Sequence, residues 1–118
     1  MSTLSNQSIP QITVRELAER MKQADHQLQL IDVREPEEVE IASIEGFTYL
    51  PLSRFSEWSG TIQSQFDPHA ETLVLCHHGV RSAQMCQWLY QQGFTQVINI
   101  SGGIEAYSVL VDDSVPRY

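Results

Sequence analysis

The stretch from Thr72 to Ala83, which reads TLVLCHHGVRSA, constrains the fold of this chain more than any other. It begins with a short apolar run that ends in Cys76, continues as a glycine-containing loop, and shows helical spacing from Ser82 onwards. This order predicts a buried strand, a tight loop and a helix. A strand that leads through a short loop into a helix is the repeating unit of α/β domains.

The same stretch places a cysteine where its thiolate would be stabilised. Cys76 would lie at the carboxyl end of the strand, among backbone N–H groups and in front of a helix N-terminus, where the potential is positive. Arg81 adds a fixed positive charge, and His77 and His78 add more whenever either is protonated. Residues 76–81 are therefore predicted to form a cradle for an anion, with a nucleophile at its base.

Each cysteine also has a purely structural interpretation. A single cysteine is often a small buried hydrophobe, but a core residue would not need the two histidines, the glycine and the arginine that follow Cys76 directly. Cys86 falls on the apolar face of the helix expected at residues 82–92, together with Ala83 and Leu89. We therefore interpret Cys76 as a nucleophile and Cys86 as a packing residue rather than a resolving thiol.

Apolar patterns elsewhere predict the remaining elements of an α/β domain. Strands are expected at residues 9–12, 28–33, 47–50 and 96–100, and helices at residues 14–23, from Pro36, from Ser53 through Ile62, and at residues 104–109. Thr13 and Glu16 have the spacing of a capping box for the first helix. The apolar density of LQLIDV at residues 28–33 suggests burial on both faces, and hence a mostly parallel sheet.

Length and charge limit the organisation and the partners. The 118 residues suffice for one domain, with a loose arm expected at residues 1–8 and an irregular tail at residues 110–118. A net charge of -8 with dispersed basic residues argues against nucleic acid or an anionic membrane surface as a partner. No apolar run approaches the ~20 residues that cross a bilayer, and the start lacks a signal pattern, so we expect a cytoplasmic protein.

The metal-binding side chains do not have the spacing of a metal site. Two cysteines are too few for a disulfide scaffold or a cysteine-based zinc site. His77 and His78 are adjacent, so their side chains diverge, and His69 is distant and is expected on the surface of a turn. No metal and no cofactor are predicted.

Asp32 and Arg34 stand at the carboxyl end of the strand expected at residues 28–33. In open α/β sheets this edge is where sites form. The two side chains could equally pair with one another, with Glu38 or with loop backbone, and we favour this supporting role. The acidic residues around Pro36 are interpreted as a solvated helix start rather than a cation site.

Three stretches resemble the rhodanese, or sulfurtransferase, family in their order and spacing. They are LIDVREPEEVE at residues 30–40, LVLCHHGVRSA at residues 73–83 and GFTQVINISGGIEAY at residues 93–107. The resemblance covers nearly the whole chain from Ile12 to Tyr107. It implies a three-layer domain, with a five-stranded sheet and helices on both faces, and a cysteine that carries sulfur as a persulfide.

The resemblance also assigns roles to residues of this chain. Cys76 would be the nucleophile, and we expect it to be partly exposed. The substrate-binding loop would consist of His77, His78, Gly79, Val80 and Arg81. Asp32 and Arg34 match the family's strand-end pair, which supports the loop, while Gly102 and Gly103 match its paired glycines, which let the last turn pass close to the site.

Two positions depart from the family pattern. Many members have a histidine after a glycine where this chain has Ser43 after Ala42, and the aromatic residue after the glycine pair, often tryptophan, is Tyr107. The first departure could alter the rim of the pocket and so the substrate.

The activity implied by the resemblance is transfer of sulfane sulfur through a Cys76 persulfide. The donor would be thiosulfate, a small anion, or a persulfide on a donor protein. The acceptor would be cyanide in vitro and a protein or small thiol in the cell.

Three other functions have to be considered for a domain of this fold. Phosphatases and arsenate reductases of this fold have a loop that is one residue longer, whereas only four residues separate Cys76 from Arg81, which favours sulfur over phosphate. Binding modules without catalysis commonly lack the cysteine that this chain retains. A sulfur carrier with little free enzyme activity is not distinguished from an enzyme by the sequence.

Overall fold

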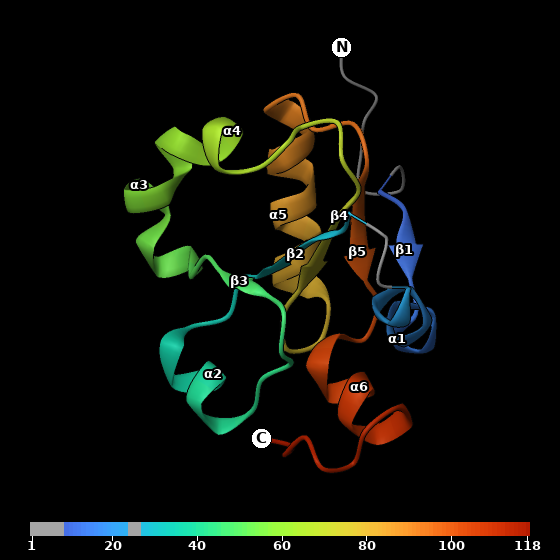
Figure 1. The fold of residues 1–118 in the computed structure, drawn as a ribbon. Helices are drawn as coiled ribbons and strands as arrows, with labels where there is room; N and C mark the ends of the chain where they lie inside the picture. Colours follow the sequence, from blue (N-terminus) through green and yellow to red (C-terminus); the bar gives the residue numbers. More distant parts are fainter. Residues whose placement is uncertain (1–8, 24–26) are drawn as a thin grey trace.

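The computed structural model describes residues 9–23 and 27–118, which form a five-stranded sheet with helices on both faces (Figure 1). The strands are Gln11–Ile12 (β1), Gln29–Asp32 (β2), Thr48–Tyr49 (β3), Thr72–Leu75 (β4) and Val97–Ile100 (β5). Their order is β1-β5-β4-β2-β3, and every neighbouring pair is parallel. Each strand lies within the stretch that its apolar pattern predicted, and the predicted fold class is confirmed. The arm expected at residues 1–8 lies outside the described residues.

Helices connect the strands. They are Val14–Lys22 (α1), Pro36–Ile41 (α2), Phe55–Trp58 (α3), Ile62–Gln65 (α4), Val80–Gln91 (α5) and Gly103–Leu110 (α6). The predicted capping box of Thr13 and Glu16 is present at the start of α1. Within the described residues, no helix is long and apolar enough to span a membrane.

The helix expected from Ser53 through Ile62 is not continuous. A three-residue 3₁₀ turn at Leu52–Arg54 precedes α3, and a second one at Ser59–Thr61 separates α3 from α4. Gly60 is a poor helix former, and it lies in the second of these turns. Trp58 is buried as expected, and its indole N–H donates to the Pro51 carbonyl at 2.9 Å.

Both faces of the sheet are buried, as the apolar density of β2 predicted. Val74 and Cys76 face one layer of the core, which includes side chains of α3, α4 and α5. Leu73 and Leu75 face the other layer, which includes side chains of α1 and α6. The odd and even positions of β4 therefore contact different helices, and this explains why its residues are apolar without alternation.

The register of the sheet brings three strand ends together. Asp32 of β2 lies opposite Leu75 of β4, and Asn99 of β5 lies opposite Val74. Cys76 directly follows β4, so polar side chains from the two neighbouring strands end beside it. This carboxyl edge of a parallel sheet is where α/β domains place their sites.

Candidate active site

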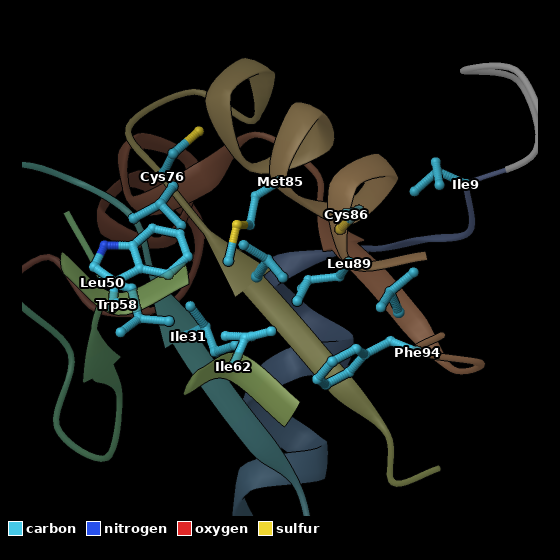
Figure 2. Close-up of a cluster of buried hydrophobic side chains, with 13 residues drawn as sticks. Ile9, Ile31, Leu50, Trp58, Ile62, Cys76, Met85, Cys86, Leu89 and Phe94 are labelled. Carbon is cyan, nitrogen blue, oxygen red and sulfur yellow. The ribbon is translucent and has the colours of Figure 1, made fainter. Parts of the chain in front are cut away.

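Cys76 lies at the base of the loop between β4 and α5. Its Sγ accepts a hydrogen bond from the backbone N–H of Gly79 at 2.9 Å and lies 3.2 Å from Oγ of Ser82. Figure 2 shows the sulfur pointing away from the apolar side chains around it. Cys76 is only 1% exposed, so the expectation of partial exposure is wrong. The loop folds back over the sulfur and turns the Gly79 N–H toward it.

The turn of this loop depends on Gly79. Its φ of 104° lies in the left-handed region, which glycine adopts without strain. A Cβ atom there would lie 3.2 Å from the backbone nitrogen of Gly102. The α5 helix begins at Val80, two residues earlier than Ser82, where helical spacing was first evident. The N-terminus of this helix therefore adds its positive potential next to the sulfur of Cys76.

The start of α6 holds the loop carbonyls. The backbone N–H groups of Ile104 and Glu105 donate to the carbonyls of Cys76 and His77 at 2.9 and 3.1 Å. A Cβ at Gly103 would lie 2.4 Å from the His77 carbonyl oxygen, closer than atoms can approach. The predicted close passage of the glycine pair is therefore present, and it directs the loop carbonyls toward α6.

Asp32 and Arg34 form a buried ion pair, both with no exposed side-chain surface. Nε and Nη2 of Arg34 donate to the two carboxylate oxygens of Asp32, at 3.0 and 2.7 Å. Burial opposes the charge of Arg34, but hydrogen bonds with Asp32 and with Tyr118 outweigh it and raise its pKa. Neither side chain has a hydrogen bond to the Cys76 sulfur within the described residues. The two side chains therefore pair with one another, which is one of the partners that the sequence left open, and their support of the loop stays a prediction.

Arg81 and Glu38 connect the loop to α2. The guanidinium of Arg81 donates to both carboxylate oxygens of Glu38, at 2.7 and 2.9 Å. Hydrogen bonds from Arg81 lower the pKa of Glu38 to about 2, against the opposing effect of burial. Arg81 therefore forms an ion pair with Glu38, and its charge is largely neutralised at the loop.

Tyr118 links these two ion pairs. Its hydroxyl accepts from Nη1 of Arg34 at 2.9 Å and donates to Oε1 of Glu38 at 3.0 Å. Residues 111–118 follow α6 without regular structure, as expected for a tail, yet Val115 is buried in the core. The tail therefore crosses back to α2, where Figure 1 shows the end of the chain.

The two histidines of the loop have different surroundings. His77 stacks between His78 and Tyr118, with ring centroids 4.0 and 3.9 Å apart. Burial, followed by the neighbouring His78, lowers the pKa of His77, so it is mainly neutral at neutral pH. Its contribution to the positive potential is smaller than the sequence suggested. His78 is exposed beside it.

A cavity of about 400 Å³ opens beside the loop. On one side it is lined by the end of the loop and the first turns of α5. On the other side it is lined by β1 and by the carboxyl end of β5. Its lining includes His78, Gly79, Val80, Gln84, Asn99 and Ser101. Val80 is 67% exposed at its rim. Within the described residues, no group of three or more metal-binding side chains is placed to hold an ion.

Sequence reasoning named Glu38 only as a possible partner of Asp32 and Arg34, and it did not identify three further polar residues around the loop. They are Ser82, Asn99 and Tyr118. Asn99 had a signal, since a polar side chain in an otherwise apolar strand requires a buried partner. Ser82 could have been noted as the polar residue on a buried helix face. The sequence around Tyr118 offers no comparable signal.

The model of the family described as "Rhodanese-like domain" matches residues 13–109. The match includes the candidate nucleophile, the loop and the glycine pair. It also includes both strand ends that contribute Asp32 and Asn99.

Two curated relatives extend this comparison. The "Rhodanese-like/PpiC domain-containing protein 12, chloroplastic" of Arabidopsis thaliana is 48% identical over 112 residues, which is 93% of this chain and 38% of that protein. The chain thus spans well under half of this relative. The "Putative sulfurtransferase YtwF" of Bacillus subtilis is 34% identical over 99 residues, 84% of this chain and 90% of the relative.

A solved structure shows the same fold. The "Rhodanese-like Domain Protein from Staphylococcus aureus" has a TM-score of 0.73 and 24% sequence identity, over 93% of this chain and 99% of that one.

Proposed function

The chain belongs to the rhodanese-like family, which supports a sulfurtransferase activity at family level, and we propose that it transfers sulfane sulfur through a persulfide on Cys76. The donor in this proposal is thiosulfate or a persulfide, and the acceptor is a thiophile such as cyanide or a thiol. One observation carries the proposal: the sulfur of Cys76 receives the Gly79 N–H at 2.9 Å, at the N-terminus of a twelve-residue helix. That position favours an anionic sulfur.

The cycle is a double displacement. In the first half, the Cys76 thiolate attacks the outer sulfur of thiosulfate, a new S–S bond forms, and sulfite leaves with the electron pair of the bond that breaks. In the second half, the acceptor attacks the outer sulfur, and the Cys76 thiolate leaves with the electrons of the S–S bond. Cyanide becomes thiocyanate in this step. The Gly79 N–H and the α5 N-terminus stabilise the negative charge on sulfur in both halves.

The remaining candidate residues have distinct roles in this proposal. Asp32 and Arg34 support the loop from the sheet, and Arg81 holds its end against α2 through Glu38. His78 and Val80 form the rim that a donor or acceptor would approach, because both are exposed there. His77 fills the space under Tyr118.

A phosphatase activity is less well supported. Such a reaction needs a loop arginine that is free to bind a tetrahedral oxyanion, whereas both outer nitrogens of Arg81 donate to Glu38. The loop has only four residues between Cys76 and Arg81. A phosphatase assay with p-nitrophenyl phosphate is expected to give no turnover.

The cytoplasmic location remains a prediction. The most similar relative described above is named as chloroplastic, so the compartment of this chain has to be measured. A fluorescent fusion viewed in cells would test it.

Intact-protein mass spectrometry tests the proposed function. Wild-type protein incubated with thiosulfate is expected to gain one sulfur atom, which later addition of cyanide removes. Cys86→Ser is the matched control and should gain sulfur like the wild type, while Cys76→Ser should not. Sulfur gain by Cys76→Ser would refute the assignment of the nucleophile. If the wild type gains no sulfur from thiosulfate but does from a cysteine desulfurase, a carrier role is favoured over a free enzyme.

A further inference from the structure

A chain of buried hydrogen bonds runs behind the sulfur of Cys76. Oγ of Ser82 lies 3.2 Å from Sγ, and the same hydroxyl donates to Oδ1 of Asn99. Nδ2 of Asn99 donates to the Gly79 carbonyl and to Oε1 of Gln11, both at 3.0 Å. Ser82 is 0% and Asn99 is 3% exposed, so water cannot readily replace the bond between Ser82 and Asn99.

The neighbours of Asn99 determine the direction of each bond. The backbone carbonyl of Gly79 can only accept a hydrogen bond, so Nδ2 must face it and Oδ1 must face Ser82. Oδ1 carries no proton, and the Ser82 hydroxyl must therefore donate to it. Because a hydroxyl has one proton, Ser82 can then only accept a hydrogen bond from Cys76.

The Ser82 hydroxyl in this orientation can accept from a Cys76 thiol but offers no proton to a thiolate, so it opposes the anionic sulfur that the Gly79 N–H favours. The S–H of a thiol can donate to Oγ of Ser82, which completes the chain. A thiolate has no proton to donate, so two lone-pair atoms would face one another unless the Ser82 hydroxyl turned to the sulfur. That rotation would leave Oδ1 of Asn99 buried without the donor it has in this structure, which costs free energy.

The persulfide lessens this conflict, because Sγ still has no proton but no longer carries the negative charge. When the thiolate attacks thiosulfate, the Sγ–S bond forms, the S–S bond of the donor breaks, and sulfite takes the electron pair. No proton moves, and the negative charge now lies on the outer sulfur. Sγ has become a neutral, weakly accepting atom. Ser82 can keep its hydrogen bond to Asn99 while the outer sulfur takes donors from elsewhere in the loop.

We propose that Asn99 is a positioning residue that acts through Ser82 to favour the persulfide of Cys76 over the free thiolate. The inference rests on the proposed persulfide cycle. Its consequence is that the loaded chain keeps its sulfur until a strong acceptor arrives, because returning to the thiolate breaks a buried hydrogen bond.

The equilibrium between unloaded protein and the Cys76 persulfide tests the role of Asn99. Wild type, Asn99→Leu, Ser82→Ala and the double variant are equilibrated at about pH 9, above the usual range of a thiol pKa, in a fixed mixture of thiosulfate and sulfite. The loaded fraction is then read by intact mass after rapid alkylation. The charged and titratable groups of the elements around Cys76 are the same in all four proteins. Arg81 and Cys86 interact with Cys76 directly, and the loop, α2, the end of β2 and the tail contribute His77, His78, Glu38, Asp32, Arg34 and Tyr118.

Asn99→Leu is expected to lower the ratio of loaded to unloaded protein roughly three- to tenfold, the factor that one buried hydrogen bond supplies. In the Ser82→Ala background the same substitution should change the ratio less than about twofold, since its effect passes through Ser82. An equal drop in both backgrounds, or no drop in the first, would overturn the proposal. Failure of the wild type to load would instead refute the proposed function.

Asn99→Asp provides a second test in case Asn99→Leu does not fold. It keeps the size of the side chain and an oxygen that accepts from Ser82. Its added negative charge also opposes a thiolate next to Ser82 more than a charge on the outer sulfur. Because its second oxygen would face the Gly79 carbonyl, Asn99→Asp is compared with Asn99→Asp/Ser82→Ala. We expect Ser82 to raise the loaded ratio in this background at least as much as it does in the wild type, and a smaller effect of Ser82 would contradict the role of residue 99 as its acceptor.

Discussion

Cys76 and Cys86 are both buried, with 1% and 0% exposure, but they have opposite surroundings. Cys86 lies among Met85, Leu89 and other apolar side chains (Figure 2), and burial raises its pKa to about 12. Cys76 has the Gly79 N–H at 2.9 Å and the Ser82 hydroxyl at 3.2 Å. Burial alone therefore does not distinguish an inert thiol from a candidate nucleophile, whereas the polar groups around the sulfur do.

The difference arises from the elements that carry the two residues. Cys86 is in the middle of α5, where the backbone N–H groups are already used within the helix. Cys76 is at the end of a strand, where the chain turns and its N–H groups become available. Both cysteines belong to the same apolar cluster, and what separates them is that the sulfur of Cys76 points to the polar groups of the loop.

Alkylation should show the largest difference between the two thiols. A pKa of about 12 leaves roughly one Cys86 in ten thousand ionised at pH 8, so iodoacetamide should label Cys76 at least about 100-fold faster in the native protein. Peptide mass spectrometry over time measures both rates. Comparable rates would show that cover by the loop, rather than ionisation, controls access to Cys76.

Breaking the ion pair beside the loop should have the next largest effect. Arg34→Met leaves Asp32 buried without its partner and should lower the free energy of unfolding by about 3–5 kcal/mol, measured with urea. Arg117→Met is the matched control, because Arg117 pairs with Glu105 but is 65% exposed, and it should cost less than about 1 kcal/mol. If Arg34→Met and Arg117→Met lowered the free energy of unfolding equally, the buried ion pair would contribute no more to stability than the exposed one.

Gly103→Ala should disturb the cysteine loop and spare the surroundings of Cys86. Its Cβ would lie 2.4 Å from the His77 carbonyl, so a loss of at least about 2 kcal/mol is expected, together with slower sulfur loading. Gly93→Ala has a similar positive φ, but the nearest atom is 4.0 Å away, and it should cost only about 1 kcal/mol. Thermal unfolding measures the loss of stability, and the loading assay measures the rate of sulfur gain. If Gly103→Ala and Gly93→Ala behaved identically in both, the close approach of Gly103 to the His77 carbonyl would not be supported.

Serine substitution should affect the two cysteines in opposite ways. Cys76→Ser should abolish sulfur transfer with a loss of stability below about 0.5 kcal/mol, because the Gly79 N–H and Ser82 remain as partners for a hydroxyl. Cys86→Ser should retain transfer and cost about 1–2 kcal/mol, because it buries a hydroxyl on an apolar face. A stable but inactive Cys86→Ser would instead indicate a resolving thiol.

The ion pair between Glu38 and Arg81 should contribute less to stability, and an acid titration should show that its contribution depends on pH. Glu38 has a folded pKa of about 2, below its ordinary value of 4.5, so its stabilisation is present above about pH 4.5 and is lost as the pH falls toward 2. Glu38→Gln should therefore be less stable than the wild type at neutral pH, by up to about 1 kcal/mol. The two proteins should converge as the pH falls through this window. A constant difference down to pH 2 would contradict the assigned cause.

The local parts of the site were predictable because short-range rules govern them. The capping box of Thr13 follows from spacing within a single turn, and the buried strands follow from apolar runs. A pairing of Asp32 with Arg34 could be considered because the two residues are two positions apart at the same strand end. The break between α3 and α4 was missed because the apolar spacing continues across Gly60 although the backbone does not stay α-helical there.

The sequence by itself determined the fold class, the parallel sheet and a cysteine loop in front of a helix, because each depends on neighbouring residues. Only the tertiary structure decided that Cys76 is covered, that Arg81 is bound to Glu38, and which side chain stands behind the sulfur. Tyr118 reaches Arg34 across 84 positions of the chain, and Asn99 reaches Gln11 across 88. Such contacts depend on strand order and on the path of the tail, and no local pattern records either.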